Sequence, residues 1–257
     1  RALFVTAILT GSFLLFLVQP MVARMALPRL GGAPAVWNSA MLVYQLLLLA
    51  GYGYAHWLSR WPLRRQAAIH LGLLLGAALT LPVGLVALPP VAPGEEVFWV
   101  PLLLALSIGP VFFLVSAQAP LLQRWFAADP AAPEPWALYA ASNLGSFGGL
   151  LAYPLLAEPL MSLHWQSRGW SIGYLVLIAL VALCALARRG LADGTTAVAV
   201  DREPTSRLSR RTIALWLALG AVPSGLMLST TTHLTTDLFA MPLLWVIPLG
   251  LYLLSFV

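Results

Sequence analysis

The sequence predicts an all-α membrane protein, a bundle of transmembrane helices that crosses the bilayer about eight times. Of the 257 residues, 60% are hydrophobic and 9% are charged, and the mean hydropathy is +0.87. A soluble domain carries about 25% charged residues and buries at most about 75% of the surface of its chain. A soluble globular domain of this composition could not bury its apolar surface, so that class is excluded. The charged residues also leave eight uncharged stretches of at least 19 residues, and a membrane-spanning helix needs about 20.

Each apolar stretch is expected to form a helix, because a backbone surrounded by lipid must satisfy its own hydrogen bonds. The expected helices are 2–26, 34–58, 64–88, 97–126, 135–161, 170–188, 212–239 and 241–257. All ten Trp residues fall near an end of one of these ranges, as indole rings do at the membrane interface.

The positions of the Arg residues predict how the chain is oriented in the membrane and where it divides into segments. Ten Arg fall in the second, fourth and sixth connections and three in the odd-numbered ones, which predicts a cytoplasmic N-terminus. We expect a six-helix transmembrane bundle over 1–189, a basic cytoplasmic loop over 190–211, and over 212–257 two spans that begin a second, truncated helical half. The net charge of +5 reflects this membrane pattern, and no nucleic-acid partner is predicted.

Small residues at helical spacing predict close contact between helices, since close backbone approach drives helix association in lipid. Three sets have this spacing: Gly72 with Gly76; Ala141, Gly145 and Gly149; and Ala221, Gly225 and Ser229.

Polar side chains within the apolar stretches form the candidate intramembrane site, because such residues usually face the bundle interior or a water-filled path. The candidates are His233, Asp237, Ser229, Gln45, Gln118, Asn143 and Glu158. His233 and Asp237 lie four residues apart and share a helix face, where an imidazole and a carboxylate can carry protons or bind a cation. A structural alternative is open for each: hydroxyl groups often bond to their own helix, amides can bond to a neighbouring helix, and Glu158, near a helix end, can be a solvated or interfacial acid.

Motifs for covalent chemistry are absent from the sequence. There is one Cys, no pair of His four residues apart, no phosphate-binding loop, no dinucleotide fingerprint and no G-x-S-x-G sequence. We therefore predict no catalytic residue, no metal site and no cofactor in this segment.

Six strings carry a family resemblance: LLFLVQP (14–20), LPRLGGAPAVW (27–37), LLAGYGYAH (48–56), YAASNLGS (139–146), THLTTD (232–237) and PLLWVIPL (242–249). With them the chain resembles, along essentially its whole length, the membrane portion of the bacterial fused spermidine-synthase-like proteins. This resemblance implies a major-facilitator-like helix arrangement in the bacterial cytoplasmic membrane and a soluble, aminopropyltransferase-like C-terminal domain that these residues do not include. Any transferase activity would belong to that domain.

The second connection is similar to a degenerate facilitator inner-loop motif, formed by Gly51, His56, Arg60, Arg64 and Arg65. His56 stands where that motif usually has Asp.

Three functions follow from these observations. The first is an integral membrane module that anchors or serves the soluble transferase-like domain. The second is a transporter-like bundle for a small organic solute or cation, with a polyamine as the first solute to test. The third is an accessory subunit of a larger membrane complex; besides the lipid bilayer, the expected partners are that soluble domain or other membrane subunits.

Overall fold

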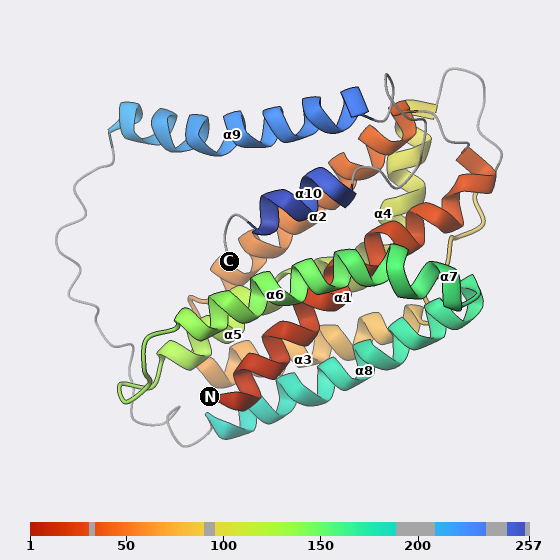
Figure 1. Ribbon diagram of the computed structural model, residues 1–257. Coiled ribbons are helices and arrows are strands. Elements are labelled where there is room, and N and C mark those ends of the chain that lie inside the picture. Colours follow the sequence, from red (N-terminus) through yellow and green to blue (C-terminus); the bar gives the residue numbers. More distant parts are fainter. Residues whose placement is uncertain (31–33, 90–95, 189–208, 235–245, 255–257) are drawn as a thin grey trace.

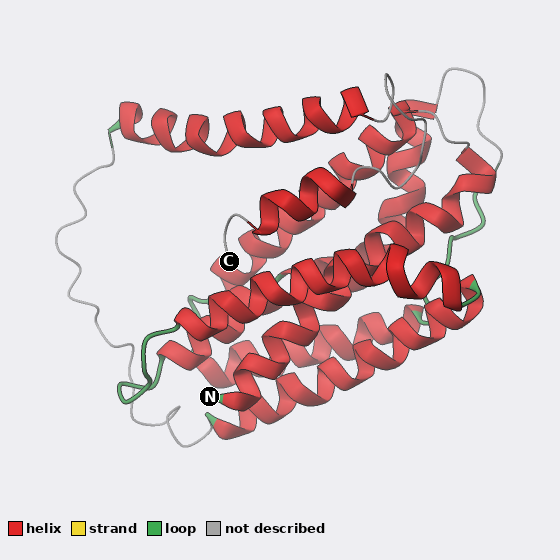
Figure 2. Cartoon of the chain, viewed as in Figure 1, coloured by secondary structure: helices red, strands yellow, loops and turns green. Residues whose placement is uncertain are grey.

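A computed structural model describes residues 1–30, 34–89, 96–188, 209–234 and 246–254. Every regular element in these residues is a helix (Figure 2). The elements are α1 (Ala2–Leu30), α2 (Pro34–Leu58), α3 (Leu63–Ala77), η1 (Ala78–Thr80), α4 (Glu96–Ser116), α5 (Gln118–Ala127), α6 (Trp136–Ala152), the π-helix η2 (Tyr153–Ala157), α7 (Glu158–Leu160), α8 (Leu163–Ala187), α9 (Arg210–His233) and α10 (Val246–Leu254).

Four stretches are long and apolar enough to cross a membrane. They are Ala2–Arg29, Phe98–Ala127, Leu163–Ala187 and Arg210–His233. The all-helical class is therefore confirmed within the described residues, and these four helices fit the predicted membrane character.

The largest differences from the predicted helix boundaries are in the third and sixth helices. The third helix was expected to reach 88 but leaves helical geometry after Thr80, because Leu81 precedes Pro82 and adopts an extended conformation with ψ of 151°. The sixth helix was expected to begin at 170 but begins at Leu163. Arg168 is tolerated inside it because the residue is exposed and its guanidinium lies over the Trp165 ring, 5.7 Å from the centroid.

Helices α1 to α8 form one six-helix body, in which successive long helices run in alternating directions (Figure 1). Helix α1 lies at its centre and packs against α6, α8, α4 and α5. Helix α10 packs on α6, whereas α9 lies apart from the body, and among the described elements its principal contact is with α10 (Figure 1).

The six-helix body consists of two similar three-helix units. The first unit is α1, α2 and α3, and the second is α4–α5, α6–α7 and α8. Exchanging the units reproduces the packing: α1 packs along α6 as α4 does along α2, α1 contacts α8 as α4 contacts α3, and α3 lies beside α8. Because each unit has three helices, the second begins at the opposite end of the body from the first (Figure 1).

Residues 100 positions apart occupy equivalent places in the first and third helices of the units. Identical pairs are Phe13 and Phe113, Leu14 and Leu114, Pro20 and Pro120, Arg24 and Arg124, Leu63 and Leu163, and Gln66 and Gln166. One of these pairs also makes the same hydrogen bond in both units. Gln66 Nε2 donates to the Trp61 carbonyl at 2.7 Å, and Gln166 Nε2 donates to the Met161 carbonyl at 2.8 Å.

The second helix of each unit is seated on the first helix of the other through a glycine. A Cβ on Gly149 of α6 would fall on the carbonyl oxygen of Phe13, and one on Gly51 of α2 would lie 2.8 Å from the carbonyl oxygen of Phe113. Gly145 lies equally close to the Leu9 carbonyl, and Ser12 and Ser142 are 3.1 Å apart beside it. The small-residue set at 141, 145 and 149 is therefore confirmed as a contact surface, and its partner is α1.

The other two small-residue sets do not make such contacts in the described residues. A Cβ on Gly72, Gly76 or Gly225 would meet no atom within 4 Å. Gly72 is exposed on α3, and the described side chains of α9 include no buried one. These two predictions of close packing are wrong for the described part of the chain.

Candidate functional site

Two of the candidate amides occupy equivalent positions in the two units. With Gly51 equivalent to Gly149, Gln45 of α2 corresponds to Asn143 of α6. Gln45 is exposed on the same helix face as Leu49, which is 67% exposed, and Asn143 is half-buried. Each therefore brings a carboxamide to an outer flank of the body, midway along its helix, where it can donate and accept hydrogen bonds.

Helix α10 covers the flank of α6 near Asn143. A Cβ on Gly250 would lie 3.8 Å from the Phe147 ring, one turn along α6 from Asn143. The equivalent of Phe147 on α2 is Leu49, which is 67% exposed. The two amides thus lie on similar surfaces, one of which is partly covered by α10 at Phe147, while the other is open among the described residues.

The third amide, Gln118, is a packing residue. It begins α5 after the break at Ala117, is 1% exposed, and donates from Nε2 to the Ala7 carbonyl at 3.5 Å. Its Oε1 lies against Gly11 of α1 and has no hydrogen-bond partner among the described residues. Gln118 therefore joins α5 to α1 and does not reach the surface that carries Gln45.

Glu158 forms an ion pair with Arg24 at the end of the body where α1 and α6 meet. The distance from Arg24 Nε to Glu158 Oε1 is 3.3 Å, and the side chains are 48% and 28% exposed. The π-helix η2, which precedes Glu158, contacts α1. A π-turn of this kind is often found at functional sites.

The second connection has the equivalent arrangement at the opposite end. Arg124, the counterpart of Arg24, donates to the Ser59 carbonyl at 3.1 Å, and Ser59 Oγ donates to the His56 carbonyl at 2.6 Å. His56 is exposed, so the residue that replaces the motif's acid has its ring outside the packed body. The backbone of the connection is held by Arg124 without a carboxylate.

Three further arginines are exposed at the same end: Arg60 in this connection, and Arg64 and Arg65 in the first turn of α3. The Arg65 guanidinium lies over the Trp61 ring, 5.6 Å from its centroid. The result is a basic surface that includes an aromatic residue, which is the composition expected where a helix meets a membrane surface.

The candidates on α9 are placed only in part. Ser229 and His233 are exposed on this helix, and Asp237 lies outside the described residues, so the spacing of His233 and Asp237 is not tested. Hydroxyl groups nearby bond back to their own helix, as Thr231 Oγ1 does to the Met227 carbonyl at 2.8 Å.

Two polar clusters in the body were not among the sequence candidates. In one, the buried Trp125 donates from Nε1 to Gln66 Oε1 at 2.9 Å, and His70, one turn from Gln66 and 1% exposed, has Nδ1 3.4 Å from the Tyr54 hydroxyl. The counterpart of Trp125 is Met25, which has no N–H to donate, and Gln166 Oε1 has no partner among the described residues. The 100-residue spacing of Gln66 and Gln166 is the signal that would have identified this cluster.

The second such cluster joins the ends of α5 and α8. Arg188 Nη1 lies 2.6 Å from Asp129 Oδ2, and its guanidinium lies over the Phe4 and Phe126 rings at 5.1 and 5.5 Å. The backbone N–H of Ala131 and the Arg188 guanidinium lower the pKa of Asp129 below its usual value. This cluster fixes the end of the bundle by charge and ring contacts.

The described residues contain no group of three His, Cys, Asp or Glu that could hold a metal ion. What they offer is carboxamide hydrogen bonding on two outer flanks and paired or stacked arginines at the ends of the body. Comparisons of the chain with protein-family models, with curated proteins and with solved structures found no match.

Proposed function

We propose that this chain is a facilitator-like integral membrane module whose bundle binds and moves a small polar solute. In this proposal it crosses the bacterial cytoplasmic membrane eight times, with its N-terminus in the cytoplasm. Four long apolar helices support the membrane location. Helix α2, with 25 residues, is about 37 Å long and can also span the apolar layer. The remaining crossings are assigned to α3, α6 and α10, which pack against the longer helices.

The observation that carries this proposal is the pair of three-helix units in opposite orientation. Facilitator-type transporters are built from 3+3 inverted repeats, and their substrate sites lie near the bilayer midplane at the interface between repeats. The exchange of contacts between the units, and the matching of Gly51 with Gly149 and of Arg24 with Arg124, support the same construction here.

The residues proposed to contact the solute are Gln45 and Asn143. A neutral carboxamide near the middle of a membrane costs less than a charge and supplies both a donor and an acceptor. In this proposal each unit contributes one amide to the solute, Gln45 from the first and Asn143 from the second. The family resemblance makes spermidine the first solute to test, followed by small neutral and cationic amino compounds.

The test is uptake into liposomes by the reconstituted full chain. We expect Gln45→Leu and Asn143→Leu to lower the initial uptake rate at least tenfold, whereas the control Leu46→Ile leaves the rate unchanged. The exposed Gln45 should also be replaceable with a change in unfolding free energy of no more than about 0.5 kcal/mol. Uptake that is unaffected by both amide variants would contradict the assigned site, and the absence of uptake of every solute would contradict transport.

A second function is favoured by the resemblance to the fused spermidine-synthase-like proteins: the bundle holds a soluble transferase-like domain at the membrane. Isolation of the protein from its natural membrane tests this function. A catalytic domain, fused or co-purifying, is the expected result, and its absence would contradict the anchoring function.

A further inference from the structure

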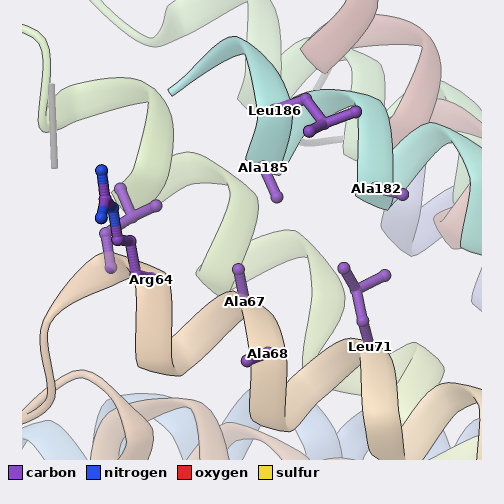
Figure 3. A pocket seen from close by; sticks show the side chains of 8 residues that line it. Arg64, Ala67, Ala68, Leu71, Ala182, Ala185 and Leu186 are labelled. Atoms are coloured by element: carbon purple, nitrogen blue, oxygen red, sulfur yellow. The ribbon is translucent and has the colours of Figure 1, made fainter. Parts of the chain in front are cut away.

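A groove with an arginine at one end lies between α3 and α8 on the outside of the six-helix body. Its volume is about 530 Å³. Ala67 and Ala185 form the floor and are each 7% exposed. Figure 3 shows Ala67 and Leu71 on α3 opposite Ala185 on α8, with Arg64 at one end of the row. The small alanine side chains leave this space open.

The equivalent place in the other unit is closed by the chain itself. There, Ser167 of α8 donates to the carbonyl oxygen of Val83, which is 3% exposed, and the N–H of Val86 donates to Ser107 at 3.1 Å. The extended segment that follows η1 thus lies directly on α8. At the groove, α8 instead remains helical to Ala187, and no described residue fills the space beside α3.

The walls of the groove and the arginine at one end together indicate the kind of molecule that it binds. Its walls are hydrocarbon, which suits an acyl chain. One end carries the exposed Arg64, Arg65 follows it in α3, and Arg60 lies in the connection before that helix. Trp61, which lies under the Arg65 guanidinium, marks this end as the level of the lipid headgroups. Basic pockets between helices bind anionic headgroups through the phosphate.

We propose that the groove between α3 and α8 binds one acyl chain of an anionic glycerophospholipid, and that Arg64 binds its phosphate group. The lipid takes the place beside α3 that segment 81–89 takes beside α8 in the other unit. It therefore completes the packing of the second unit. This site is separate from the flanks that carry Gln45 and Asn143, and it does not depend on a transport function.

Native mass spectrometry of the purified full chain tests the site, with phosphatidylglycerol and phosphatidylcholine of identical acyl chains as probes. The wild type should retain phosphatidylglycerol about fivefold more strongly, since a basic residue near the membrane surface contributes about 1 kcal/mol and 1.4 kcal/mol is tenfold. Arg64→Gln should keep a bound lipid but lose this preference. Ala182→Phe fills the groove with a ring and should remove the tightly bound lipid of either type.

Two matched variants on α8 serve as controls. Arg168→Gln removes the arginine that lies over Trp165 near the other end of the helix, and Ile172→Phe adds a ring at a position that is 63% exposed. Both should retain the wild-type preference, and all four variants should melt within a few degrees of the wild type in detergent. Equal binding of the two lipids by the wild type, or a preference that survives both Arg64→Gln and Ala182→Phe, would overturn the proposal.

Discussion

Replacing Gly149 by alanine should destabilise the protein, whereas the same change at its neighbour Gly148 should not. A Cβ on Gly149 would overlap the Phe13 carbonyl oxygen and lie 3.0 Å from both the carbonyl carbon and the Cα of Phe13. The obstacle is backbone, which no rotamer change can move. At Gly148 the nearest atom is Cδ2 of the Phe13 ring at 3.7 Å, an ordinary van der Waals contact.

The magnitude follows from two opposing effects. Glycine to alanine within a helix stabilises by about 0.5–1 kcal/mol, and this gain is common to both variants. Forcing α6 away from α1 to admit a methyl group costs about 1–3 kcal/mol of packing. We therefore expect Gly149→Ala to unfold with a free energy about 1–3 kcal/mol below that of Gly148→Ala.

The assay is equilibrium unfolding in mixed micelles with increasing denaturing detergent, with helicity followed by circular dichroism. Comparing adjacent positions of one helix cancels the effects of helix propensity, micelle and expression. Gly51→Ala supplies a second case in the other unit, where the Cβ would overlap the Ser116 hydroxyl and lie 2.8 Å from the Phe113 carbonyl oxygen. If the two variants on α6 unfold within about 0.5 kcal/mol of each other, the seating of α6 on the α1 backbone is refuted.

Two further predictions concern polar contacts of the body. Trp125→Phe removes the 2.9 Å hydrogen bond to Gln66 and leaves a buried amide oxygen without a donor, so the unfolding free energy should fall by about 1–3 kcal/mol. The control is Trp99→Phe, which removes a hydrogen bond at the surface and should change the unfolding free energy far less. Equal losses in the two variants would contradict the buried bond. Asp129→Asn should lower the melting temperature at neutral pH. The pKa of Asp129 is lowered in the folded state, so its contribution to stability is present above the usual Asp pKa and is lost as the pH falls through the lowered value. The melting temperatures of wild type and variant should therefore converge in acid. A difference in melting temperature that persists in acid would disprove the charge contribution.

Spacing of charges was sufficient to predict the class of this protein, because a long uncharged stretch has few alternatives to a membrane helix. The helix ends were less accessible. Hydropathy continues through Leu81 and Val83, but Pro82 ends the helical geometry, and a hydropathy argument does not detect that.

The sequence identified the polar residues of the candidate site, but it could not predict which other residues each of them contacts. Gln45, Gln118 and Asn143 are alike in sequence, yet one is exposed, one buried against α1 and one half-buried near α10. Small-residue spacing has the same limit: it shows where two helices can approach but not which helix is there. That is why the set containing Gly149 makes contact and the one containing Gly225 does not. The prediction for Asp237 remains a prediction.

The reciprocal seating of α6 on α1 and of α2 on α4 also bears on biosynthesis. Ser12 and its contact Ser142 are 130 residues apart in the chain, so α1 enters the membrane long before the surface that receives it has been synthesised. Neither three-helix unit contains the partner of its own first helix. A nascent chain that stops after α5 therefore leaves the Leu9 and Phe13 backbone of α1 facing lipid or the insertion machinery, and quality control of this protein should act on that intermediate.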